Sequence, residues 1–184
     1  MIFKETKLRD AYIIEIEERS DQRGFFARAW CQKEFEDHGL VAQVVQTNLS
    51  YNIKKGTLRG MHFQIDPYQE TKLVRCTRGA IYDVIIDLRP ESPTYKDWIG
   101  VELSGENYKM LYVPKNFAHG FQTLVDGTEV TYQVTEFYTP GAEGGLRYDD
   151  PAFRIAWPLP VSVISEKDKC WPAFSSCIRP QEKY

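Results

Sequence analysis

The sequence predicts an all-β protein, a sandwich or barrel that forms one domain. Strand-like runs dominate the chain, and turn signals separate them about every 8–12 residues. Only one segment has a helical pattern. The chain has 184 residues, which is enough for one domain with a sizeable core, and no linker divides it. We therefore expect a single domain over 1–184, with 175–184 as a loose tail.

The elements follow in order from apolar and β-branched runs and the turns between them. Arg78-Gly79 divides 72–88 into two strands, and Asp126-Gly127 lies between two strands that we expect to pair. The polar residues 104–107 are expected to form a hairpin loop. The predicted strands are 12–16, 41–53, 72–88 (as two), 98–103, 109–113, 121–124 and 129–138. One short helix is expected over 31–38, with Gly39 as its stop signal.

Composition excludes several classes of partner. The net charge of −3 offers no bulk attraction for nucleic acid or for an anionic membrane. No apolar run approaches the roughly 20 residues of a membrane span, and the charged N-terminus does not resemble a signal peptide. The cysteines at 31, 76, 170 and 177 match no zinc motif. We expect a cytoplasmic protein with reduced thiols.

Three histidines are present, and two have informative surroundings. His38 is expected to be an exposed or capping residue at the end of the helix. If 58–64 is a strand, His62 and Gln64 share one face, while Met61 and Phe63 share the other. His119 is expected at the start of a strand, between Pro114 and Gly120.

His62 and His119 are each either hydrogen-bonded core residues or functional groups. A metal-binding β-barrel often supplies a His-x-His pair, but Gln64 stands where the second histidine would be. Two histidines without a cysteine or carboxylate at a typical offset are few for a tight site, so we expect no metal.

An acid–base function needs partners for these histidines. Asp168 is a candidate for orienting an imidazole base, and Tyr132 is either a proton donor or a core aromatic residue. Lys72 is either a solvated charge or a group that stabilises an enolate. Arg23 and Arg59 are natural phosphate ligands, or else surface residues.

Taken together, these segments resemble the nucleotide-sugar 3,5-epimerase family, of the dTDP-4-dehydrorhamnose 3,5-epimerase type. The resemblance runs from about residue 10 to 172, and it depends on the joint order and spacing of many motifs. The motifs are DQRGFF (21–26), QTNLS (46–50), LRGMHFQ (58–64), KLVRCTRGAIYDVIIDLR (72–89), SPTYKDWIGVELS (92–104), VPKNFAHGF (113–121), TYQVTEFYTP (131–140), RYDDP (147–151) and SEKD (165–168).

The resemblance implies a cupin-type jelly-roll barrel with short helices, usually a homodimer that exchanges strands. It implies a nucleotide-diphosphate-linked 4-keto-6-deoxy sugar as substrate and no cofactor. His62, supported by Asp168, matches the base, Lys72 the group that steadies the enolate oxygen, and Tyr132 the acid. Further positions match substrate contacts: His119, Arg59, Arg23 and Lys167 for sugar and diphosphate, Gln46, Asn48 and Glu143 elsewhere, and Tyr138 stacked on the nucleobase.

The sequence departs from the family pattern at Arg28, where many members have glutamate. A guanidinium donates hydrogen bonds and suits the acceptor edge of cytosine better than the N3–H of thymine. We therefore include Arg28 among the substrate-binding residues and consider a CDP-sugar beside a dTDP-sugar. The alternative is that Arg28 turns outward and another residue reads the base.

Three alternatives to 3,5-epimerisation remain at this point. The first is epimerisation at C3 or C5 alone, which depends on placement at the ångström level. The second is a 3,4-ketoisomerase, which shares the jelly roll. The third is a non-catalytic sugar-binding module, in which His62, Tyr132 and Asp168 need not converge.

Overall fold

The computed structural model describes residues 1–174, which form two antiparallel sheets, a protruding hairpin and two short helices. The first sheet contains β1 (Ile2–Glu5), β2 (Tyr12–Glu15), β5 (Gln46–Asn52), β7 (Lys72–Arg78), β10 (Met110–Val113) and β12 (Thr128–Val134). The second contains β6 (Leu58–Gln64), β8 (Ala80–Asp87), β9 (Trp98–Ser104), β11 (Phe117–Thr123) and β13 (Glu143–Gly145). The hairpin consists of β3 (Arg19–Asp21) and β4 (Gly24–Phe26), and the helices are α1 (Gln32–Asp37) and α2 (Glu166–Lys169).

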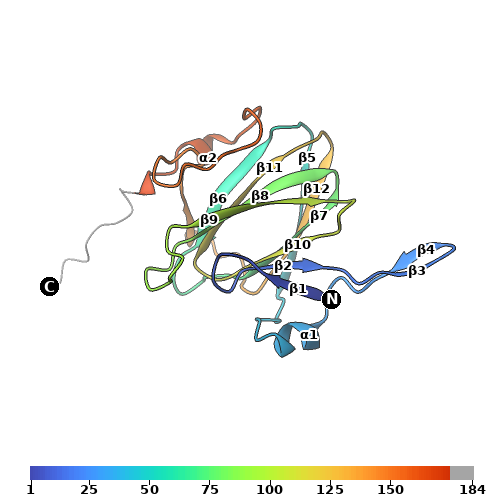
Figure 1. The fold of residues 1–184 in the computed structure, drawn as a ribbon. Coiled ribbons are helices and arrows are strands. Elements are labelled where there is room, and N and C mark those ends of the chain that lie inside the picture. The colour runs from blue at the N-terminus through green and yellow to red at the C-terminus, as the bar shows by residue number, and fades with distance from the viewer. Residues whose placement is uncertain (175–184) are drawn as a thin grey trace.

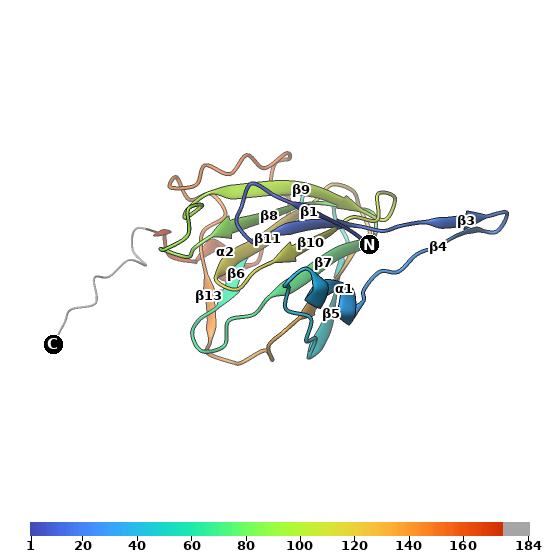
Figure 2. The ribbon, with the colours of Figure 1, turned by 60° about the horizontal axis from the view of Figure 1, so that its bottom comes forward.

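The two sheets pack face to face, and the hairpin β3–β4 extends away from both (Figures 1 and 2). Their strand orders are β1-β2-β10-β7-β12-β5 and β13-β6-β11-β8-β9. From β5 to β8, and again from β9 to β13, successive strands alternate between the sheets. The expected all-β jelly roll is confirmed. No helix within residues 1–174 is long and apolar enough to cross a membrane. The tail predicted over 175–184, with Cys177, lies outside the described residues.

Alternation along each strand decides which side chains enter the space between the sheets. Val74 of β7, Phe121 of β11 and Val130 of β12 belong to the apolar core there. Leu73, on the other face of β7, packs outside the sandwich in the same cluster as Phe35 of α1. Polar side chains take inward positions on the same strands at Lys72, His119 and Tyr132. The space between the sheets therefore contains polar groups beside its apolar core.

Two predicted hairpins are wrong, because each joins strands of different sheets. Trp98–Ser104 pairs with β8, whereas Met110–Val113 pairs with β2 and β7, so 104–107 is a crossover. Likewise β11 pairs with β6 and β8, whereas β12 pairs with β5 and β7. A polar turn signal marks where the chain reverses. Whether the flanking strands share a sheet depends on how the apolar faces pack.

Several boundaries also differ from the predictions. The strand expected over 41–53 begins at Gln46, and the one expected over 129–138 ends at Val134. His119 lies inside β11 rather than at its start. Short elements were missed because a run of three or four residues has too little periodicity to stand out: β1, β3, β4, β13 and α2. The helix at 31–38 is confirmed as Gln32–Asp37, with His38 exposed at its C-cap.

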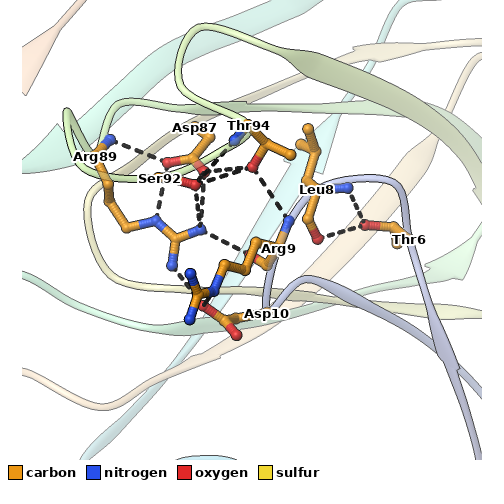
Figure 3. Close-up of polar contacts among 8 residues, drawn as sticks. All are labelled: Thr6, Leu8, Arg9, Asp10, Asp87, Arg89, Ser92 and Thr94. Carbon is orange, nitrogen blue, oxygen red and sulfur yellow. Dashed lines mark hydrogen bonds and ion pairs between the residues drawn. The ribbon is translucent and has the colours of Figure 1, made fainter.

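A cluster of polar groups ties the N-terminal loop to the loop after β8 (Figure 3). Asp87 has no exposed surface and accepts hydrogen bonds from Arg89, Ser92 Oγ at 2.5 Å and Thr94 Oγ1 at 2.7 Å. Arg89 in turn pairs with Asp10 at 2.7 Å. Burial alone would raise the pKa of Asp87, but these hydrogen bonds outweigh it and hold the pKa below its ordinary value. This cluster stabilises the contact between the N-terminal loop and the loop that follows β8.

Candidate active site

Two adjoining cavities, of about 510 and about 330 Å³, are lined by residues of both sheets. Three side chains border both of them: His62 from β6, Lys72 from β7 and Tyr132 from β12. His62 thus comes from one sheet, while Lys72 and Tyr132 come from the other. The first cavity is also lined by Gln46, Asn48, Phe63, Gln64, Glu70, Tyr138, Glu143 and Gly144. The second is also lined by Leu49, Ser50, Tyr51, Arg59, His119 and Phe121.

His62 forms a dyad with Asp168. Its Nε2 lies 2.6 Å from Asp168 Oδ1, and the histidine side chain is 41% exposed while the aspartate is 6% exposed. Asp168 sits on α2, whose first turn is capped by Ser165 Oγ, which accepts from the Asp168 amide at 3.1 Å. The helix α2 therefore places a buried carboxylate against Nε2 of a partly exposed imidazole.

The charge state of Asp168 sets the tautomer of His62. Burial alone would raise the pKa of Asp168, but hydrogen bonds from His62, the Gly60 amide and the Trp171 indole outweigh it and lower the pKa. The carboxylate is thus ionised at neutral pH, and Nε2 carries the proton. Among the described residues no group hydrogen-bonds to the other ring nitrogen, Nδ1. This nitrogen is free to accept a proton from a bound molecule.

The facing alternation predicted for 58–64 is confirmed. Met61 is fully buried in the cluster outside the second sheet, with Phe63 packed against it. His62 and Gln64 both line the first cavity. The close approach of β6 to β11 requires a glycine at position 60, because a Cβ there would lie 2.5 Å from Cα of Gly120.

Lys72 and Tyr132 form the opposite wall. Lys72 is buried rather than solvated, and its Nζ lies 3.1 Å from Glu70 Oε1. Tyr132 packs against the apolar core with one part of its ring and borders both cavities with another. Burial and then the charge of Glu70 raise the pKa of the Tyr132 phenol, and Arg59 opposes them. The phenol therefore keeps its proton at neutral pH and is able to donate it.

A second histidine–aspartate dyad lies beside the first. His119 pairs with His62 across β11 and β6, and its Nε2 lies 2.7 Å from Asp83 Oδ1. Asp83 has no exposed surface, and its Oδ2 has no hydrogen-bond partner among the described residues. Asp83 was not among the site residues predicted from the sequence. Its signal was present, since alternation in β8 places it on the same face as Ile81 and Ile85 of the core.

The remaining predicted site residues near these cavities lie at their walls or rim. Arg59 borders the second cavity, where its Nε donates to Asn52 Oδ1 at 2.7 Å. Gln46 donates to Asn48 at 2.8 Å, and Tyr138 stands half exposed at the rim of the first cavity. Glu143 lines that cavity and pairs with Lys167 of α2 at 2.5 Å.

Gln64 and Glu70 also line the first cavity and were not predicted as site residues. Gln64 accepts from the Thr139 amide at 2.9 Å and donates to the Phe137 carbonyl at 3.2 Å, so it anchors the segment that carries Tyr138. The alternation of β6 is the signal that could have identified Gln64. Glu70 precedes its strand, so no such pattern marks it.

Arg23 and Arg28 are not brought to the cavities of this chain. Arg23 lies at the tip of the β3–β4 hairpin, 85% exposed, and pairs with Asp21 at 2.6 Å. Arg28 follows the hairpin and pairs with Glu34 of α1. Neither residue lines the two cavities, so their predicted contact with substrate stays a prediction. Within residues 1–174, no three histidine, cysteine, aspartate or glutamate side chains gather in a way that could hold a metal ion.

Comparison with known proteins identifies the family. Residues 5–176 match the family model described as dTDP-4-dehydrorhamnose 3,5-epimerase. The enzyme of that name from Sinorhizobium fredii is 42% identical over 174 residues, which cover 94% of this chain and 89% of that protein.

Solved structures agree. The dTDP-4-dehydrorhamnose 3,5-epimerase of Elizabethkingia anophelis superposes with a TM-score of 0.93 at 39% identity, covering 96% of this chain and 97% of that one. A Legionella pneumophila epimerase in complex with dTDP-4-keto-L-rhamnose gives 0.84 at 39% identity, covering 91% of this chain and 89% of that one. From the half-open histidine dyad to these matches over nearly the whole chain, the observations lead to one conclusion: the chain belongs to the dTDP-4-dehydrorhamnose 3,5-epimerase family, whose members are sugar isomerases.

Proposed function

We propose that this protein inverts C3 and C5 of a nucleotide-diphosphate-linked 4-keto-6-deoxy sugar by proton transfer between its own side chains. The observation that carries the proposal is the opposition of two groups across one cavity. His62, held by Asp168, comes from one sheet, and Tyr132 comes from the other. Inversion requires a proton to leave one face of a carbon and another to arrive at the opposite face. A base and an acid on facing walls meet that requirement.

The first step is removal of a proton beside the ketone. The 4-keto group acidifies the C3 and C5 hydrogens, because the electron pair of the broken C–H bond delocalises onto the C4 oxygen. Nδ1 of His62 takes the proton, and the Lys72 ammonium stabilises the developing oxyanion. Each acid–base group is expected to contribute about 10²–10⁴-fold in rate, and an oxyanion donor about 10²–10³-fold.

The second step returns a proton to the opposite face. The Tyr132 phenol forms the new C–H bond, and the enolate electrons return to the carbon. Tyr132 and His62 then exchange protons with water to reset the site. Repeating the two steps at the other carbon inverts both centres. His119, with Asp83 behind it, is proposed to contact the sugar as a further donor at the same wall.

The nucleotide is proposed to bind toward the rim. The Arg59 guanidinium suits a diphosphate oxygen, and the half-exposed Tyr138 ring suits stacking on the base. Gln46, Asn48, Glu143 and Lys167 supply further polar contacts around it. The relative from Legionella pneumophila binds a dTDP-sugar, which supports dTDP as the nucleotide here. CDP stays the alternative that Arg28 raises.

We propose a homodimer that completes this site. Strand β5 is the free edge of its sheet and borders both cavities, and it exposes Leu49, while the hairpin exposes Phe26. An edge strand has unpaired backbone groups that accept an added strand. If the hairpin of a second copy lies along β5, it brings Arg23 and Arg28 of the partner subunit toward the nucleotide. Light scattering tests the dimer, and cell fractionation tests the predicted cytoplasmic location.

Deuterium exchange tests the reaction. The protein is incubated in D₂O with dTDP-4-keto-6-deoxyglucose, in parallel with the CDP analogue, and proton NMR follows the H3 and H5 signals. Loss of both signals is expected, with His62→Asn strongly impaired and His38→Asn as the matched control. Loss of one signal would indicate a mono-epimerase. Binding without exchange would favour the ketoisomerase or the sugar-binding module, and the faster nucleotide decides the base.

A further inference from the structure

Glu70 is a partly buried carboxylate in the wall of the first cavity, and the reaction described above gives it no role. Its side chain is 14% exposed, and it pairs at 3.1 Å with Lys72, whose side chain is 9% exposed. The desolvation of two buried charges offsets most of their attraction, so stability alone is a weak reason for such a pair. The location of the pair beside the reacting groups suggests a different reason.

The backbone around Glu70 is held on both sides. Thr71 donates its amide to Thr135 Oγ1 at 2.9 Å, and the Thr135 amide donates to the Thr71 carbonyl at 3.1 Å. On the other side, Gln64 Nε2 donates to the Tyr68 carbonyl at 3.0 Å and lies 3.5 Å from Glu70 Oε2. The carboxylate is therefore fixed relative to β7 and β12, which carry Lys72 and Tyr132.

We propose that Glu70 is a positioning residue for the epimerase reaction: it holds the Lys72 ammonium in the cavity wall and keeps a negative charge near the Tyr132 phenol. The inference rests on the proposed function. An ammonium has three N–H donors, so one bond to Glu70 leaves two for the oxygen at C4. Fixing this flexible side chain before substrate arrives reduces the entropy that is lost when the oxyanion forms.

The charge of Glu70 acts on Tyr132 through its surroundings. Several titratable and charged groups border the cavities with Tyr132. They are Tyr51 from β5, Arg59 and His62 from β6, Lys72 from β7, His119 from β11, Tyr138, Glu143 from β13, and Glu70. After burial, Glu70 is the strongest cause that raises the pKa of Tyr132, and Arg59 opposes it. A negative neighbour disfavours the phenolate, so Tyr132 stays a proton donor at higher pH.

Two substitutions separate these effects. Glu70→Gln keeps an oxygen that accepts from Lys72 but removes the charge, whereas Glu70→Ala removes both. We would measure kcat and KM for dTDP-4-keto-6-deoxyglucose between about pH 6 and about pH 11, a range that extends beyond the ordinary phenol pKa of ~10. Glu91→Gln, at an exposed position that lines neither of these two cavities, is the matched control.

Glu70→Ala is expected to lower kcat by about 10–100-fold, as misplacement of a reacting group does, with KM within about threefold of the wild type. Glu70→Gln is expected to retain most of kcat at neutral pH. The alkaline limb of its profile of kcat against pH should move to lower pH, because the negative charge near Tyr132 is removed. An alkaline limb that stays in place in Glu70→Gln, or a kcat of Glu70→Ala equal to that of the control, overturns the inference. Deuterium exchange by the wild type tests the proposed function separately, so a failure of one is distinguishable from a failure of the other.

Discussion

Two buried aspartates contrast a structural role in one region of the molecule with a proposed chemical role in another. Asp87 and Asp168 are both shielded from water, and both have a lowered pKa. Asp87 is surrounded by a guanidinium and two hydroxyls within the described part of the fold, and it borders neither cavity (Figure 3). Asp168 has an imidazole as its closest partner, and that imidazole is 41% exposed to the cavity.

The difference lies in whether the residue that contacts the aspartate keeps an unused hydrogen-bonding group. Arg89, Ser92 and Thr94 direct their hydrogen bonds to one another, to Asp87 and to the N-terminal loop, so the cluster is closed. His62 uses one nitrogen on Asp168 and leaves the other toward the cavity. We expect the closed cluster to stabilise the fold, and we propose that the open dyad transfers protons. The Asp83–His119 pair differs from both, because it is almost fully buried and one oxygen of Asp83 has no partner in residues 1–174.

The largest effect should come from Asp168→Asn. An asparagine side chain donates through its NH₂ to Nε2 and favours the tautomer with the proton on Nδ1, so His62 cannot act as a base. We expect kcat to fall about 10²–10⁴-fold with little loss of stability. Deuterium exchange at C3 and C5 gives the rate, and urea unfolding gives the stability. An unimpaired rate would remove the dyad from the mechanism.

The matched substitution in the other region is Asp87→Asn. It removes the charge that Arg89 requires, and breaking a buried ion pair is expected to lower the free energy of unfolding by about 3 kcal/mol. The rate per folded molecule should stay that of the wild type, since Asp87 borders neither cavity. Urea unfolding and active-site titration measure the two quantities. If this variant instead lost rate and kept its stability, the comparison would be reversed.

The smallest expected effect is the dependence of stability on pH. Both aspartates have a lower pKa in the folded protein than in the unfolded chain, where it is ~3.9. Below that value the unfolded state binds more protons, so the free energy of unfolding falls as pH decreases through the folded pKa values. The stabilisation is fully present above the unfolded pKa. Urea unfolding from about pH 3 to about pH 7 should show a shallower loss in Asp87→Asn than in the wild type; equal slopes would mean that Asp87 does not contribute.

Local signals predicted much of the fold. The runs at Tyr12–Glu15, Ala80–Asp87 and Met110–Val113 lie in strands that were expected there. Strand pairing was not predictable in the same way. The segments 104–107 and 126–127 have the composition of hairpin loops, yet they connect strands of different sheets. Composition reports that the chain turns, but the burial of both apolar faces decides which strands become neighbours.

The site divides along the same line. Residues implied by family motifs, such as His62 and Tyr132, do meet at one pair of cavities. Asp83 and Glu70 were missed, because their importance lies in which side chain each one meets. Arg23 and Arg28 line neither cavity of their own chain, so their proposed contact with the nucleotide depends on the proposed homodimer.

By itself, the sequence determined the alternation of side chains along each strand, and with it the faces of the two sheets. It also supplied the motifs that identify the family. Only the tertiary structure decided that side chains of β6, β7, β11 and β12 border the same pair of cavities, and that α2 places Asp168 against His62. The physical reason is that alternation is a local consequence of backbone geometry. The meeting of His62 and Asp168, 106 residues apart, depends on packing the whole sandwich.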